Sequence, residues 1–95
     1  MKVVKLSGRD GSGKNTVATN MRLSAEANGK SVYVSAIIIS SSPDFQKDLK
    51  RANKQMEKYD LGILRIDVPD QPLTIELNEY FSHGWLSILF PKFEN

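Results

Sequence analysis

The sequence predicts an α/β fold of three layers, built on a parallel sheet in βαβαβαβ order. A glycine-rich loop lies between a short apolar segment and a segment of helical periodicity. Later apolar segments are nearly continuous, which is typical of strands covered on both faces. Strand-like and helix-like segments alternate along the chain, and the right-handed crossover rule then predicts parallel strands with helices over both faces.

The first predicted strand, residues 3–6, leads into a loop with the P-loop spacing G-x-x-x-x-G-K. In this motif, tightly turning backbone directs N–H groups towards a phosphate, and the lysine neutralises its charge. The predicted fold is therefore of the P-loop type. The alternative is a solvated Gly/Ser turn. The residues predicted to bind phosphate are Gly8, Arg9, Asp10, Gly11, Ser12, Gly13, Lys14, Asn15 and Thr16.

Residues 16–28 are predicted to form a helix, because apolar side chains recur there at helical spacing. Asn28-Gly29 suits a left-handed cap at the end of this helix. A competing interpretation places a hairpin turn at Asn28-Gly29 between two strands. Residues 31–39 are almost continuously apolar and predict a buried strand.

Residues 43–59 predict an amphipathic helix with Ser42 as its N-cap and Pro43 at its first position. Its apolar stripe contains Phe45, Leu49, Ala52 and Met56. Another stripe is basic and could bind nonspecific DNA through its phosphates, or could simply be a solvated face. The basic residues are Lys47, Lys50, Arg51, Lys54 and Lys58.

The remaining chain predicts a strand at residues 61–68, a helix at 73–82 and a last strand at 85–90. Asp67 lies near the end of the first of these segments, and Pro91 stops the last one. His83 is the one histidine, and its place beside a helix end favours a surface cap over a catalytic base.

Length and composition predict a single domain, 1–95, with one modest core. The chain has no cysteine, which excludes disulfides and thiolate metal sites and fits a cytoplasmic protein. No apolar run is long enough to predict a membrane span. The net charge of +2 is too small to indicate a partner.

With these elements placed, the chain resembles the ParA/MinD family of deviant Walker-A ATPases. Gly-Lys-Asn-Thr-Val-Ala-Thr-Asn-Met, residues 13–21, is similar to the family's G-K-T-T-x-A-x-N-L. Residues 59–69 are similar to its Y-D-x-(x)-I-I-D-x-P, whose aspartate falls on Asp67. The resemblance covers nearly the whole chain, as a short member that lacks some internal segments and the C-terminal half.

The resemblance implies binding of ATP with Mg²⁺, and a role in partitioning DNA or a cargo. It assigns catalytic roles to Lys14, Asp67 and Arg9, and metal ligands to Asn15, Thr16 and Asp67. The family's signature lysine falls on Arg9, and Asn15 replaces a metal-binding hydroxyl. Isoleucines stand where the family has aspartates that orient water. Weak or lost hydrolysis is therefore expected, with a homodimer or heterodimer as the assembly.

The alternative function is a non-enzymatic interaction module that pairs with a partner through an exposed sheet edge. The loop also resembles that of nucleotide kinases such as thymidylate kinase. Residues 40–49 resemble a segment of restriction-type nucleases, but isoleucines occupy the positions of the nuclease acid and lysine, so nuclease activity is not expected.

Overall fold

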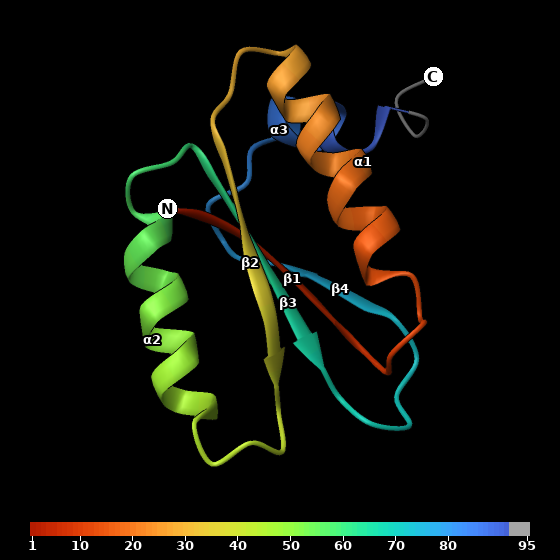
Figure 1. Cartoon of the computed structure of the whole chain (residues 1–95). Helices are drawn as coiled ribbons and strands as arrows, with labels where there is room; N and C mark the ends of the chain where they lie inside the picture. The colour runs from red at the N-terminus through yellow and green to blue at the C-terminus, as the bar shows by residue number, and fades with distance from the viewer. Residues whose placement is uncertain (92–95) are drawn as a thin grey trace.

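A computed structural model describes residues 1–91 of the chain, so residues 92–95 of the expected domain lie outside the described part. Three helices and four strands follow one another within it (Figure 1). Their order and bounds are β1 (Lys2–Gly8), α1 (Lys14–Ala27), β2 (Val32–Ile39), α2 (Phe45–Met56), β3 (Leu61–Asp67), β4 (Thr74–Leu77) and α3 (His83–Leu89).

The strands form one mixed sheet in the order β2-β3-β1-β4. β3 pairs in parallel with both β1 and β2, whereas β4 pairs antiparallel with β1. In the parallel register, Gly8 of β1 lies beside Asp67 of β3, and Asp67 lies beside Ile39 of β2. The three parallel strands therefore end at the same edge of the sheet, where α/β proteins commonly bind ligands.

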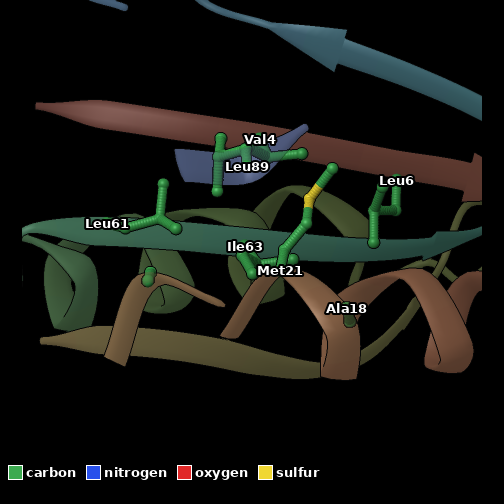
Figure 2. Close-up of a cluster of buried hydrophobic side chains, with 8 residues drawn as sticks. Val4, Leu6, Ala18, Met21, Leu61, Ile63 and Leu89 are labelled. Carbon is green, nitrogen blue, oxygen red and sulfur yellow. The ribbon is translucent and has the colours of Figure 1, made fainter. Parts of the chain in front are cut away.

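Helices cover both faces of the sheet, and each face has its own apolar cluster. On one face, α1 and α3 pack against β1 and β3 (Figure 2). That cluster contains Val4, Leu6, Ala18, Met21, Ala25, Leu61, Ile63 and Leu89. On the other face, α2 contributes Ala52 and Met56, which pack with Ile38, Leu64 and Ile66. Alternation along β3 thus directs odd-numbered side chains to α1 and even-numbered apolar ones to α2.

The predicted P-loop-type fold with an all-parallel βαβαβαβ sheet is wrong: the strand order is β2-β3-β1-β4, and residues 74–77 form the antiparallel strand β4 inside the segment predicted as a helix, 73–82. The connection from β3 to β4 is too short for the crossover that a parallel neighbour requires, which takes about a dozen residues. Lys5 of β1 and Glu76 of β4 form an ion pair of 3.3 Å across the antiparallel strand pair. Just after β4, the Asn78 side-chain oxygen accepts a hydrogen bond from the Val3 N–H of β1 at 3.2 Å.

The predicted final strand at residues 85–90 is also wrong, because this segment belongs to the helix α3. The Ser82 hydroxyl caps the helix by accepting a hydrogen bond from the Trp85 N–H at 3.3 Å. Trp85, Ile88 and Leu89 then fall at helical spacing and pack on the cluster beneath α1. A short apolar run is compatible with a strand or a buried helix, and here the cap and the packing surface decide between them.

The other predicted elements are confirmed within a few residues at their ends. Asn28 follows the last residue of α1, so the hairpin interpretation of Asn28-Gly29 is wrong. His83 is the first residue of α3 and does not close a preceding helix. Within residues 1–91, no helix has the length and apolar character needed to cross a membrane.

Candidate functional site

The glycine-rich loop, residues 8–13, connects the end of β1 to the start of α1. Hydrogen bonds from the segment after β3 fix its first residues. The Val68 N–H donates to the Gly8 carbonyl at 3.0 Å, and the Arg9 N–H donates to the Gln71 carbonyl at 2.8 Å. The loop is therefore held by the edge of the sheet where the parallel strands end.

Two glycines have structural reasons to be glycine. A Cβ on Gly8 would lie 2.8 Å from the Ser12 hydroxyl oxygen and 2.9 Å from the Pro72 carbonyl oxygen, closer than real Cβ contacts. Gly13 precedes α1 with φ of 103°, in a region that side chains rarely adopt. Substitution at either position would change the path of the loop.

Lys14 is the first residue of α1 and is only 5% exposed. Its ammonium group donates to the carbonyl oxygens of Gly8 and Arg9, each at 2.8 Å. An ammonium has three N–H donors, so one remains for a ligand. The lysine thus lies across the loop with its charge held at the helix start.

The N-terminus of α1 favours a negatively charged group beside it. Its cap residue, Gly13, has no side-chain capping bond, and the first helical turn contains no acidic residue. Free N–H groups at a helix start attract anions, and the helix dipole adds to the attraction. The loop, Lys14 and the helix start therefore combine three features that favour a phosphate.

A pocket of about 440 Å³ opens beside this helix start. A cavity of this size is within the usual range for small-molecule sites. Asp67 lines it from the end of β3, and two exposed isoleucines line it from β2. The lining residues are Asp10, Gly11, Gly13, Lys14, Asn15, Thr16, Ile37, Ile39 and Asp67.

Six of the nine residues predicted to bind phosphate therefore line one pocket together with Asp67. Gly8, Arg9 and Ser12 belong to the loop but do not line the pocket. The Arg9 side chain is exposed, and within the described part of the chain Arg9 is held by hydrogen bonds of its backbone atoms alone. Its predicted catalytic role stays a prediction.

Sequence reasoning missed Arg65, which adjoins the site from β3. Its guanidinium donates to the Asn15 side-chain oxygen at 2.7 Å and to the Ser35 carbonyl oxygen at 2.8 Å. Strand alternation could have indicated that Arg65 is near the site, because it lies two residues before Asp67 and on the same face of β3. Asn15 and Arg65 are fifty positions apart in the chain, so no local sequence signal indicates the contact itself.

The residues predicted to hold Mg²⁺ are Asn15, Thr16 and Asp67, and all three line the pocket. Asp67 is the one carboxylate among them, and the Asn15 oxygen already accepts from a guanidinium. Mg²⁺ prefers carboxylate and water oxygens in octahedral geometry. Within residues 1–91, no group of three or more His, Cys, Asp or Glu side chains could hold a metal ion. Mg²⁺ sites usually combine one or two protein ligands with water and substrate phosphates, so the role of these three residues as Mg²⁺ ligands stays a prediction.

The basic residues predicted to contact DNA lie apart from the pocket, on or just after α2. All five side chains are exposed, and Arg51 forms a 3.7 Å ion pair with Asp48. In the described part of the chain, no carboxylate pairs with the four lysines of this stripe. The basic stripe and the pocket are thus separate surfaces.

Comparisons with known proteins add no assignment. No protein-family model, curated protein or solved structure matches the chain.

Proposed function

We propose that this protein binds the phosphate groups of a nucleotide, of the ATP class, in the pocket beside the start of α1. The observation that carries the proposal is the position of Lys14, buried at the helix start with its ammonium group donating to the carbonyls of Gly8 and Arg9. A buried cation beside free helical N–H groups is a site for an anion. The pocket volume of about 440 Å³ leaves room for more than a single phosphate.

Weak or absent hydrolysis is part of the proposal. Cleavage of a terminal phosphate requires a group that orients the attacking water. Ile37 and Ile39 form the pocket wall contributed by β2, and neither side chain can orient water. The carboxylates that line the pocket, Asp10 and Asp67, lie on the loop and at the end of β3, and not on the wall that β2 forms. The role in partitioning DNA or a cargo, and the ParA/MinD resemblance on which it depends, stay predictions.

The test is a calorimetric titration of the full chain with a non-hydrolysable ATP analogue, using the parent and Lys14→Met. We expect the substitution to abolish binding, because it keeps most of the apolar stem and removes the charge. Lys54→Met on α2 is the matched control and should bind as the parent does. Thermal melting of each variant establishes that it is folded. Equal affinities of the parent and a folded Lys14→Met variant would rule the proposal out.

The alternative of a non-enzymatic interaction module is supported by the free edge of β2. This strand is terminal in the sheet and exposes Ile37 and Ile39, 42% and 48% of whose surfaces are accessible. Unpaired strand edges can add a strand from a partner. Failure of the parent chain to bind millimolar nucleotide would favour this alternative.

A further inference from the structure

Arg65 is held beside the candidate phosphate pocket from two sides. Its Nε–H donates to the Ser35 carbonyl at 2.8 Å, and its Nη1 donates to the Asn15 side-chain oxygen at 2.7 Å. Ser35 also accepts the backbone N–H of Arg65 through its hydroxyl at 3.0 Å. Ser35 lies in the irregular part of β2, where the register shifts between Val34 and Ile37. The bulge thus turns a carbonyl and a hydroxyl towards Arg65.

This pairing changes what Asn15 can bind. Asn15 follows the loop lysine, at the position where P-loops place a hydroxyl ligand for magnesium. Its amide oxygen receives a charged donor at 2.7 Å instead. A divalent cation on the same oxygen would lie close to the guanidinium, and like charges at such a distance repel strongly. The site therefore has a protein cation where a metal would otherwise be expected.

Charge balance gives Arg65 a further role. The pocket lining contains two carboxylates, Asp10 and Asp67, against the single ammonium of Lys14. Without another cation, this lining is net negative and would repel phosphate. Arg65 and Arg9 adjoin the pocket without lining it, and both add positive charge beside it. Of the two, Arg65 has its guanidinium fixed by a hydrogen bond to a lining residue, Asn15. Its hydrogen bonds to Ser35 and Asn15 use two of its five N–H donors, so three remain beside the pocket edge that Asn15 forms.

We propose that Arg65 supplies the positive charge that a magnesium ion would supply, so that the pocket binds nucleotide phosphates without a divalent metal. This inference rests on the proposed function. A guanidinium presents a planar fork that matches phosphate oxygens, and Arg keeps its charge at any physiological pH. Asn15 is then a positioning residue that orients the guanidinium, and it does not act as a metal ligand.

The test compares the affinity of the parent chain for a non-hydrolysable ATP analogue in excess EDTA and in millimolar magnesium. We expect the two affinities to agree within about threefold. Arg65→Gln should weaken binding in EDTA by about tenfold or more, as expected for the loss of a charged hydrogen bond. Arg22→Gln is the matched control, because Arg22 is bound to Glu26 on the far part of α1.

The outcomes separate the two proposals. Binding that requires magnesium would overturn the role of Arg65 while leaving nucleotide binding intact. No binding under either condition would overturn nucleotide binding itself. If Arg65→Gln fails to fold, the comparison in the parent chain still decides whether nucleotide binding requires a divalent metal. Arg65→Lys keeps the charge and loses the fork, and we expect it to bind more tightly than Arg65→Gln; equal affinities would contradict a role for the charge.

Discussion

Ser31 and Asp60 exchange hydrogen bonds in both directions where β2 and β3 begin. The Ser31 N–H donates to the Asp60 carboxylate at 2.8 Å, and the Asp60 N–H donates to the Ser31 hydroxyl at 2.9 Å. The Ser31 hydroxyl also donates to the carboxylate at 3.2 Å. This pair joins the two segments that precede the strands and fixes the level at which β2 and β3 start.

The Ser31 N–H lowers the pKa of the Asp60 carboxyl below its usual value of 3.8, with help from the Ser31 hydroxyl and the nearby charges of Lys30 and Lys2. The folded state therefore holds the ionised form more strongly than the unfolded state does. The resulting stability is present above the usual pKa and is lost as pH falls through the lowered one.

We therefore predict that the melting temperature of the parent falls between about pH 5 and pH 2, and that Asp60→Asn flattens part of this fall. Glu79→Gln is a matched control, because Glu79 is exposed and makes no hydrogen bond or ion pair with its side chain within residues 1–91. Melting curves recorded across this pH range provide the measurement. Identical pH profiles for the parent and Asp60→Asn would contradict the role given to the pair.

A second prediction concerns Gly62 in β3, over which the buried side chain of Met56 packs. A Cβ at Gly62 would overlap the Cγ and Sδ atoms of Met56. We expect Gly62→Ala to lower the free energy of unfolding by about 1–3 kcal/mol, the usual cost of overpacking a core.

Urea denaturation measures this change. Gly84→Ala is the control, because a Cβ there would meet only the Ser82 hydroxyl at 3.8 Å. Met56→Ala removes a buried side chain and is itself destabilising, but the double variant should lose less stability than the sum of the two single losses, since the two residues touch. Additive effects of the two substitutions would show that the overlap is not the cause.

The third prediction concerns the basic stripe of α2. Lys47, Lys50 and Lys54 recur at helical spacing on its exposed side. We expect weak binding of duplex DNA of any sequence in low salt, with log affinity falling linearly against log salt. Lys50→Gln with Lys54→Gln should reduce that slope by about two, because each lysine neutralises about one phosphate.

The matched control replaces Lys2 and Lys30 with glutamine. Both ammonium groups lie 5.4 Å from the centre of the Trp85 ring, and α3 packs on the opposite face of the sheet from α2. This control removes the same charge and should leave the slope nearly unchanged. An equal fall in slope for both double variants would show that net charge, and not the α2 surface, determines binding. Absence of binding in low salt would make the stripe an ordinary solvated face.

The sequence predicted the elements whose signals are local. The buried run of β3 and the amphipathic pattern of α2 are both readable within a dozen residues, and both are confirmed. β4 and α3 were missed because their states depend on tertiary contacts. Thr74–Leu77 becomes a strand by pairing with β1, and α3 depends on the surface beneath α1 and on the Ser82 cap.

The candidate site likewise combines residues that a local sequence signal predicts with contacts that have no such signal. The loop and Lys14 were predicted because glycine spacing is a local signal, and Lys14 and part of the loop line one pocket together with Asp67. The contact of Arg65 with Asn15 joins residues fifty positions apart and has no local signature. The sequence also does not reveal that the Gln71 carbonyl accepts a hydrogen bond from the Arg9 N–H and thereby holds the loop.

The central position of β1 has a consequence for the order in which the protein can assemble. β1 is synthesised first, yet both of its strand neighbours, β3 and β4, are synthesised after residue 60. The glycine loop also takes its hydrogen bonds from Val68 and Gln71. A nascent chain that ends before these residues leaves β1 without a partner, so the pocket takes shape only when the later segment docks. If the pocket binds a ligand as proposed, only a chain synthesised beyond Gln71 has the hydrogen bonds that hold the loop of that pocket.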